Sequence, residues 1–420
     1  MNQDYDSVSS PLPPTVERFG DIYTLTWADR NIRMVIDRFD NDRHQNVTAE
    51  ITVKVLDAPE GENHITRGRA GLLSTFKTII DDGVKFGGEI NDRLDWEIMF
   101  KQMSLAVLDD YRMGEPLINL AEMTPVGKKP YILSPFIYEG CPTVIYGRGG
   151  VGKSLFCLYL AVLLQTGHSE NRIRAKKINV IYLDYEADPD ESKYRADFIS
   201  RGMGIDPSLV AIHYRHCSNP LREEIDSLQR YIRQVDADCI VIDSAIPACG
   251  DALDSGMVAK FFNALRSLSN SEKQIASLLI GHTTKAQDTT GGPFGSVVWR
   301  NGPRSVWEFR ADQQRNLNRI DVQLVHQKVN LDPLLAPVGF RINWGEGEIT
   351  FESLDARRHA VFGAEAPLAD RIEVLLEDQG GMSTDALQIA LGAQISDVED
   401  ILLLDTRFSE NGAKWELSAI

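Results

Sequence analysis

Polar and apolar residues alternate with a period of two in three segments near the N-terminus. These segments are residues 23–27, 32–36 and 47–56. The alternation predicts strands of a small antiparallel sheet. Two stretches with helical spacing follow, near residues 70–80 and 95–112. The pattern predicts a flexible leader over residues 1–18, which is rich in proline and serine, and an α+β domain over residues 19–115.

In the central part of the chain, short apolar runs alternate with helical stretches. The runs cover residues 143–146, 179–183, 239–242 and 277–280. Strands that are buried on both faces and separated by helices are typical of a mainly parallel sheet. We therefore expect an α/β domain over residues 136–352, joined to the preceding domain by a proline-containing linker over residues 116–135.

The last segment, residues 366–420, has three helical patterns followed by a hairpin-like run that turns at Asn411-Gly412. Three helices and a hairpin of this length predict a winged-helix-like domain. Its candidate recognition helix, residues 395–404, carries three acids and no base. Because an acidic helix repels the phosphate backbone, we expect this domain to contact protein rather than to read DNA.

Charge is distributed unevenly over these domains. The chain has 61 acidic and 44 basic residues, a net charge of −17. Residues 1–115 and residues 366–420 each carry a net charge of −8, so the central part is almost neutral. Acidity argues against a protein whose whole surface binds nucleic acid or anionic lipid. The two acidic domains are candidate surfaces for a protein partner, whereas the central domain remains free to hold DNA in a channel.

The five cysteines form no CxxC pair, which fits a reducing compartment. The N-terminus lacks the basic and apolar regions of a signal peptide, and the longest apolar stretch, near residues 155–164, is about half a membrane span. We therefore expect a cytoplasmic protein with no membrane partner.

The segment Gly147-Arg-Gly-Gly-Val-Gly-Lys-Ser154 matches GxxxxGK[ST] between a predicted strand and a predicted helix. Glycines let backbone N–H groups approach a phosphate, and the helix N-terminus adds positive potential. Lys153 is expected to reach the β- and γ-phosphates of ATP, and Ser154 to coordinate Mg²⁺. The predicted nucleotide-binding residues are Gly147, Arg148, Gly149, Gly150, Val151, Gly152, Lys153, Ser154 and Leu155.

Polar residues also follow the next predicted strands. Asp243 ends an apolar strand and is the second predicted magnesium ligand, beside Ser154. Glu186 follows another strand, where a carboxylate can polarise the attacking water. A third strand leads into His282, a position from which a polar group can sense the γ-phosphate.

The runs GRGGVGKS, YLDYEA, CIVIDS, LIGHTTK, GPFGSVVWRNGPRSVWEF and HQKVN resemble the RecA superfamily of P-loop ATPases. Within it, the resemblance points to plasmid- and phage-encoded hexameric replicative helicases, with KaiC and the DnaB-type helicases as more distant relatives. It covers residues 136–352. The resemblance implies a RecA-like core that hydrolyses ATP with Mg²⁺.

The same resemblance implies roles for single residues. Lys153 becomes the phosphate-binding lysine, and Glu186 becomes the catalytic base because Ser244 follows Asp243 directly. His282 resembles a sensor of the γ-phosphate. Arg304 is placed like an arginine that neutralises transition-state charge, acting in cis or in trans, with Arg300 and Arg310 as competitors. Lys328 lies where DnaB-type proteins have Lys-x-Arg, and this chain has Lys-x-Asn.

An arginine supplied across a subunit boundary implies a ring or helical homo-oligomer, which we expect to be a hexamer. The leading hypothesis is a nucleic-acid motor, a replicative DNA helicase of a mobile element or phage. Single-stranded DNA is a candidate partner through the channel loops near Lys285. The alternative is an ATP-gated assembly or signalling module, similar to KaiC, that unwinds nothing. Its support is the acidity of both flanking domains and the scarcity of bases in the channel loops.

Two further groups of residues favour plain structural roles. His213, His216 and Cys217 are metal-ligand types without a fourth ligand, so we interpret them as ordinary strand-end residues. Trp299 and Trp307 could stack on a base, but their apolar surroundings favour packing in the core.

Overall fold

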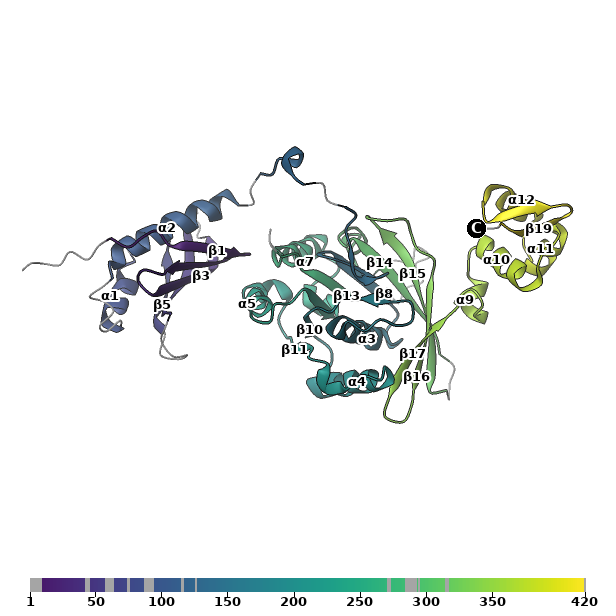
Figure 1. The fold of residues 1–420 in the computed structure, drawn as a ribbon, viewed down its shortest axis with the longest axis horizontal. Helices are drawn as coiled ribbons and strands as arrows, with labels where there is room; N and C mark the ends of the chain where they lie inside the picture. Colours follow the sequence, from purple (N-terminus) through teal and green to yellow (C-terminus); the bar gives the residue numbers. More distant parts are fainter. Residues whose placement is uncertain are drawn as a thin grey trace, which may run out of the picture. The chain divides into compact units, whose positions relative to one another are not determined.

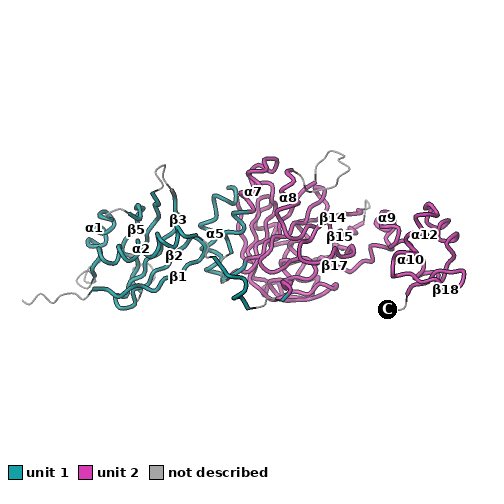
Figure 2. Tube along the Cα trace, turned by 90° about the horizontal axis from the view of Figure 1, so that it is seen from above, with its two compact units in different colours: residues 1–127, 219–236, 263–274 teal, residues 128–218, 237–262, 275–420 magenta. Residues whose placement is uncertain are grey.

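The computed structural model forms two compact units (Figure 2). The first contains residues 1–127, 219–236 and 263–274, and the second contains residues 128–218, 237–262 and 275–420. The structure describes residues 10–41, 46–56, 64–73, 76–86, 94–114, 117–124, 127–269, 273–283, 293, 295–313 and 317–418.

A five-stranded antiparallel meander and two helices dominate the first unit (Figure 1). The strands, in the order in which they pair, are β1 (Thr15–Phe19), β2 (Ile22–Trp27), β3 (Ile32–Asn41), β4 (Val47–Val55) and β5 (His64–Gly71). The helices are α1 (Lys77–Phe86) and α2 (Trp96–Met113). Alternate apolar residues of the sheet, such as Met34 and Ile51, are fully buried in one core with Met99 and Phe100 of α2.

Three strands of this sheet agree with the predicted segments, and two boundaries differ. The predicted leader is too long, because its last four residues belong to β1. The first helix begins at Lys77 rather than near residue 70, because residues 64–71 form β5. In β5 the exposed Arg67 and Arg69 alternate with the small residues Gly68 and Ala70, and the pairing with β4 decides between strand and helix.

The first unit also includes α5 (Ile225–Val235). Asp37 on β3 is buried, and its carboxylate accepts hydrogen bonds from the Arg230 guanidinium, one of them 2.9 Å from Nε. A Cβ on Gly20 would lie 2.2 Å from the Gln229 amide, so only glycine fits there without movement. The contacts of α5 lie on the face of the sheet opposite to α1 and α2. Helix α7 (Ser255–Ser267) has residues in both units.

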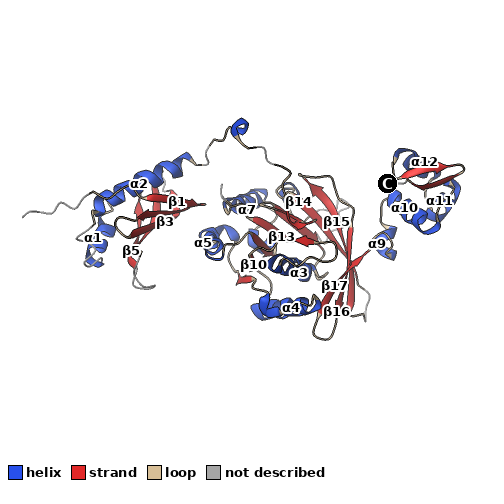
Figure 3. Cartoon of the chain, in the orientation of Figure 1, coloured by secondary structure: helices blue, strands red, loops and turns tan. Residues whose placement is uncertain are grey.

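A nine-stranded sheet forms the core of the second unit (Figure 3). Its strands, in the order in which they pair, are β11 (His213–His216), β10 (Val180–Asp184), β12 (Cys239–Asp243), β13 (Ala276–His282), β8 (Pro142–Gly147), β14 (Ser305–Asp312), β15 (Arg319–Val329), β16 (Val338–Trp344) and β17 (Ile349–Leu354). The first six are parallel, and β15, β16 and β17 continue the sheet in antiparallel fashion. The sheet is therefore mixed, and its larger part is parallel as predicted.

Smaller elements complete this unit. A three-stranded sheet pairs β6 (Tyr131–Ser134) with β7 (Ile137–Tyr138) and β9 (Arg174–Ala175). The helices are α3 (Lys153–Thr166), α4 (Pro189–Gly202), α6 (Ala245–Cys249) and α8 (Val298–Asn301). A short 3-10 helix lies at Pro207–Leu209, whereas two others, at Leu120–Glu122 and Leu221–Glu223, belong to the first unit.

Helix α3 is apolar on all sides because all its sides are covered. Its residues from Leu155 to Gln165 are all buried. Phe156 packs edge-on or tilted against Phe136, Phe309 and Phe340, and Tyr159 stacks on Phe351 of β17. Among the described residues, no helix is long and apolar enough to cross a membrane.

The C-terminal part of the second unit has its own small core. The elements are α9 (Ala360–Ala364), α10 (Leu368–Gln379), α11 (Thr384–Leu391), α12 (Ile395–Leu404), β18 (Phe408–Asn411) and β19 (Lys414–Leu417). Residues from the three longer helices meet Phe408 in one apolar cluster. Gly412 turns the hairpin with φ of 67°, which suits glycine. The three predicted helices and the hairpin are therefore present, whereas the winged-helix assignment stays a prediction.

Candidate functional site

The glycine-rich loop joins β8 to α3. A Cβ on Gly147 would lie 2.3 Å from the carbonyl oxygen of Phe309, so a larger residue does not fit there. Gly150 and Gly152 have φ of 73° and 91°, in the left-handed region that favours glycine. Because α3 begins at Lys153, the unpaired N–H groups of its first turn face the loop. The loop therefore has the backbone shape and the dipole that bind a phosphate.

Lys153 lies inside this loop. Its side chain is 4% exposed, and Nζ donates a hydrogen bond of 2.6 Å to the carbonyl oxygen of Arg148. Burial lowers the pKa of the Lys153 ammonium. A phosphate oxygen is a stronger acceptor for a buried ammonium than a neutral carbonyl, so an anion in the loop would gain this cation.

Ser154 and Asp243 face each other beside the loop. The Ser154 hydroxyl donates to Oδ1 of Asp243 at 3.2 Å, and the Tyr182 hydroxyl donates to Oδ2 at 2.8 Å. Asp243 is 3% exposed, and burial raises the pKa of its carboxyl to about 6. Hydroxyl and carboxylate oxygens are the ligands that Mg²⁺ prefers. A buried carboxyl with a raised pKa also gains from a nearby cation, so these residues fit a magnesium ion.

A third cluster lies next to this pair and centres on Glu186. Oε1 of Glu186 accepts a hydrogen bond of 2.5 Å from the Ser244 hydroxyl, and Nε2 of His282 lies 3.4 Å from the same oxygen. The hydrogen bond from His282, with a smaller contribution from Ser244, lowers the pKa of Glu186 to about 2. Half of the Glu186 side chain is exposed. Glu186 is therefore an ionised carboxylate that water can reach.

The parallel strands explain why these clusters are neighbours. Asp184 pairs with Asp243 across β10 and β12, and His282 pairs with Gly147 across β13 and β8. The carboxyl ends of these strands therefore lie at one edge of the sheet, where α/β proteins bind ligands. The structure brings together Lys153, Ser154, Glu186, Asp243 and His282.

Two residues of this edge were not predicted from the sequence. Ser244 holds Glu186, and its only sequence signal is its place directly after Asp243. Asp184 shapes the turn that carries Glu186, because its Oδ1 accepts hydrogen bonds from the backbone N–H groups of Glu186 and Ala187 at 3.0 and 2.9 Å. An aspartate at a strand end followed by an exposed glutamate is the pattern that could have indicated it.

The candidate arginines lie at different edges of the sheet. The backbone N–H of Arg304 donates to the carbonyl oxygen of Pro142, at the start of β8, whereas the glycine-rich loop follows the end of β8. Five residues at about 3.3 Å each place the two ends of β8 roughly 16 Å apart. The structure therefore does not bring Arg304 to the phosphate loop of its own subunit.

Arg310 comes from the other end of β14, near the loop. However, its guanidinium is paired with Glu308 at 2.9 Å and with Glu365 at 3.1 Å. These two carboxylates compete with a phosphate for the Arg310 charge.

Lys328 lies with Arg304 at the edge far from the loop. Its Nζ donates to the carbonyl oxygens of Asn301 and Pro303 at 3.1 and 2.6 Å. Burial and then the neighbouring charges of Arg304 and Arg300 lower the pKa of Lys328. Arg300, Arg304 and Lys328 thus form one basic cluster, and Lys328 fixes the loop that precedes Arg304.

The remaining candidates have structural surroundings or lie outside the described residues. Trp299 and Trp307 are buried, as expected for core residues. His216 lies 3.1 Å from the carbonyl oxygen of Ala187, and the described residues include no group of His, Cys, Asp and Glu side chains that could hold a metal. Lys285 lies outside the described residues.

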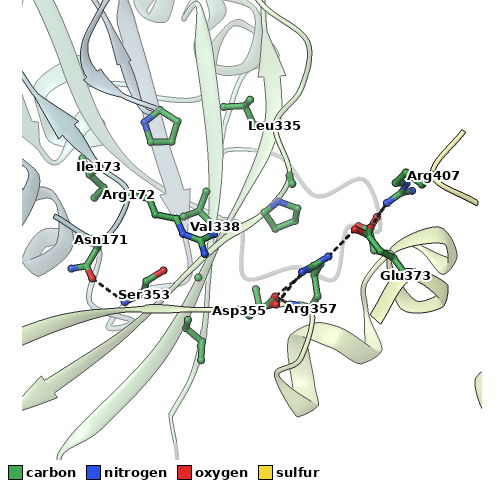
Figure 4. A pocket seen from close by; sticks show the side chains of 17 residues that line it. Asn171, Arg172, Ile173, Leu335, Val338, Ser353, Asp355, Arg357, Glu373 and Arg407 are labelled. Atoms are coloured by element: carbon green, nitrogen blue, oxygen red, sulfur yellow. Dashed lines mark hydrogen bonds and ion pairs between the residues drawn. The ribbon is translucent and has the colours of Figure 1, made fainter. Parts of the chain in front are cut away.

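A cavity of about 820 Å³ lies away from this edge, between β17 and α10 (Figure 4). One wall is a chain of ion pairs: Arg357 pairs with Asp355 and Glu373, and Glu373 pairs with Arg407. No residue of the glycine-rich loop lines this cavity. It is therefore separate from the candidate nucleotide site.

Comparisons with known proteins bear on the same domain. Residues 120–288 match the protein family described as AAA domain. No curated protein matches the chain. Two solved structures are similar over 52% of this chain and 93% of their own, each with a TM-score of 0.38. They are a KaiC-like protein, PH0186, from the archaeon Pyrococcus horikoshii OT3, at 13% identity, and the RadB recombinase, at 16% identity.

The family match covers β8, α3, β10, β12 and β13, the elements that carry the glycine-rich loop, Glu186, Asp243 and His282. The sequence, the geometry of this edge and the family match agree. Residues 120–288 are therefore similar to the AAA domain family, and their glycine-rich loop has the sequence and the backbone shape of a phosphate-binding loop.

Proposed function

We propose that this protein hydrolyses ATP with Mg²⁺ at the edge formed by β8, β10, β12 and β13. The observation that carries the proposal is the ionised Glu186, held by Ser244 and His282 beside the Ser154–Asp243 pair and the buried Lys153. A carboxylate base, a phosphate loop and a magnesium-type oxygen pair are the parts that phosphoryl transfer to water requires.

Each residue has a separate task in this reaction. The loop N–H groups and Lys153 hold the β- and γ-phosphates. Glu186 orients a water molecule and takes its proton as the water oxygen bonds to the γ-phosphorus and the bond to the ADP oxygen breaks. His282 and Ser244 hold Glu186 in position. A magnesium ion bound by Ser154 and Asp243 would neutralise charge on the phosphate oxygens.

We infer that Arg304 acts on the ATP of a neighbouring subunit. Its distance from the loop of its own subunit supports action in trans, and the basic cluster with Arg300 and Lys328 offers positive charge to a neighbour. Such an arginine would make turnover depend on assembly, in a ring or helical oligomer that we expect to be a hexamer. Sedimentation with and without nucleotide tests this, because a protein that is monomeric in both conditions would contradict it.

We further propose that hydrolysis drives a nucleic-acid motor, a replicative DNA helicase of a mobile element or phage. The competing proposal is a KaiC-like switch, in which hydrolysis changes partner binding and nothing is unwound. The segment 246–256 favours the switch, because it carries Asp251 and Asp254 and no base.

The ATPase rate with and without single-stranded DNA at low salt separates the two proposals. Strong stimulation supports the motor, and a rate that DNA does not change supports the switch. A Lys153→Ala variant is the control that any measured rate belongs to this site. If wild-type protein shows no hydrolysis above that control under any condition, the ATPase proposal itself is wrong.

A further inference from the structure

The sheet of the first unit has one face without α1 and α2. A Cβ on Gly68 would lie 3.0 Å from Ile79 of α1, which places Gly68, and with it Ile51 on β4, on the helix side. Neighbouring residues along a strand point to opposite faces. The opposite face therefore carries Thr24 and Thr26 of β2, Arg33, Val35 and Asp37 of β3, Thr48, Glu50, Thr52 and Lys54 of β4, and Arg67 and Arg69 of β5.

Two cations lie directly opposite each other on this face. Arg33 of β3 pairs in register with Lys54 of β4. Like charges in directly opposed positions destabilise an antiparallel pair. Among the described residues, neither side chain forms an ion pair, and Arg33 Nε makes only a long hydrogen bond of 3.4 Å to the Thr26 hydroxyl. The sheet therefore keeps an arrangement of charge that an anion would stabilise.

The acids on the same face are already occupied. Glu50 accepts from Arg38 at 2.7 Å and pairs with Arg67 at 3.3 Å. Asp37 is buried beneath Arg230 of α5. These carboxylates therefore do not compensate Arg33 and Lys54.

Two further acids lie on this face among the described strand residues: Glu17 on the edge strand β1, and Asp40 on β3, which pairs with Arg69 at 3.5 Å. Three strand spacings of about 4.8 Å separate β1 from β4, so Glu17 is at least roughly 14 Å from Lys54. This distance exceeds the screening length of about 10 Å at moderate salt. Among the described strand residues, therefore, no acid pairs with Arg33 or Lys54, although residues 1–115 carry a net charge of −8.

We propose that this face, built around Arg33 and Lys54, binds the phosphodiester backbone of single-stranded nucleic acid. Cations on two adjacent strands can contact successive phosphates, and the Thr26 hydroxyl can donate to a phosphate oxygen. The described aromatic residues of these strands are buried or half-buried, so bases have no exposed ring on which to stack. Recognition is then independent of base sequence and strongly dependent on salt.

This inference goes beyond the proposed ATPase, because binding on the sheet face requires neither nucleotide nor turnover. It also differs from the channel loops near Lys285 as a place for DNA. A protein with this face would hold nucleic acid by its N-terminal sheet while the RecA-type domain acts.

The test is the affinity of the full chain for a fluorescently labelled oligothymidylate, measured without nucleotide over a range of salt concentrations. For the Arg33→Gln/Lys54→Gln variant we expect weaker binding at low salt. The slope of log affinity against log salt should fall by about 1.4, because each phosphate contact in single strands contributes about 0.7. The matched control is Lys85→Gln/Lys101→Gln, which removes two lysines from α1 and α2 and should bind like the wild type.

Three results would overturn the proposal: no binding by wild-type protein at low salt, an unchanged slope in the sheet variant, or an equal loss in the helix control. Binding to anionic vesicles but not to the oligonucleotide would also overturn it and assign the face to a lipid surface. The melting temperature should not fall, because the substitutions relieve a like-charge pair. If the double variant nevertheless unfolds, Lys54→Gln alone should lower the slope by about 0.7.

The ATPase rate without nucleic acid keeps the two proposals separate. We expect the sheet variant to hydrolyse ATP at the wild-type basal rate, and we expect Lys153→Ala to lose turnover but bind the oligonucleotide normally. Loss of turnover in wild-type protein would therefore refute the ATPase alone, and unchanged binding in the sheet variant would refute the sheet face alone.

Discussion

The imidazole of His282 and the carboxylate of Glu186 lie 3.4 Å apart, between Nε2 and Oε1. They come from the ends of β13 and from the turn after β10, two strands separated in the sheet by β12. The hydrogen bond between them lowers the pKa of Glu186 to about 2. A change in the position of His282 therefore changes the proton affinity and the position of the proposed base together.

Replacing Glu186 by glutamine should leave ATP binding intact and abolish most turnover. The amide keeps the size of the side chain but cannot take a proton, and general-base catalysis is worth about 10²- to 10⁴-fold. The rate of phosphate release and the affinity for a fluorescent ATP analogue measure the two effects.

Glu191→Gln is the matched control for this experiment. Glu191 is an exposed carboxylate on α4 that pairs with Arg195. It should retain the wild-type rate. Turnover that survives in Glu186→Gln would show that another group activates the water.

Sequence motifs predict those residues of this site that directly follow a strand. The glycine-rich loop, Asp243 and Glu186 each follow a strand directly, so short sequence patterns indicate their position at the carboxyl edge. Ser244 could not be predicted as a partner of Glu186, because their contact depends on how β10 and β12 align. The position of Arg304 in the sheet could not be predicted from a motif either. Its edge of the sheet follows from the parallel register of β14 with β8, which no motif encodes.

In the fold too, the sequence pattern predicts some elements and misses others. Alternating polarity predicts β2, β3 and β4 because each has a buried and an open face. It does not predict β1, whose residues are exposed or half-buried and which is a strand by virtue of pairing with β2. Nor does it predict that α5, which follows β11 in the chain, belongs to the first unit, because this depends on contacts such as Arg230 with Asp37.

Removing the Ser244 hydroxyl should slow turnover without weakening ATP binding. Ser244→Ala deletes one hydrogen bond to the charged Glu186, and such bonds are worth about 1.5–3 kcal/mol, so a loss of roughly tenfold to a hundredfold in kcat is expected. Single-turnover kinetics at saturating ATP measure it.

Ser255→Ala is a suitable control, because the Ser255 hydroxyl contacts only Ser296 on an exposed segment among the hydrogen bonds of the described residues. A higher KM for ATP with an unchanged kcat in Ser244→Ala would contradict a positioning role for Ser244.

The pH dependence of ATPase activity should reflect the titration of Asp243 rather than that of Glu186. Burial raises the pKa of Asp243 to about 6, whereas that of Glu186 is about 2. As the pH falls through 6, protons compete with Mg²⁺ for Asp243, so the Mg²⁺ concentration required for half-maximal ATPase activity should rise. Glu186 stays ionised throughout this range.

Without nucleotide, the stability of the fold should depend on pH in the opposite direction to the ATPase activity. A carboxyl whose pKa is raised by folding binds more protons in the folded state between its unfolded and folded pKa values. Its contribution therefore makes folding less favourable as the pH rises from about 4 to 6. Asp243→Asn removes this group, so its difference in melting temperature from the wild type should depend on pH across that window. A difference that is constant with pH would contradict the raised pKa.

Mixed oligomers can test whether Arg304 acts on the neighbouring subunit. Arg304→Ala leaves the phosphate loop intact, and Lys153→Ala leaves Arg304 intact. Each variant alone should have little turnover, because an arginine of this type contributes about 10³- to 10⁵-fold in other phosphoryl-transfer enzymes. If Arg304 acts in trans, mixing the two creates interfaces with one intact loop and one intact arginine, and activity should return in part. Arg319→Ala, on an exposed residue at the start of β15, is the control and should be active alone. Oligomers that form from both variants yet remain inactive would show that Arg304 does not serve a neighbouring site.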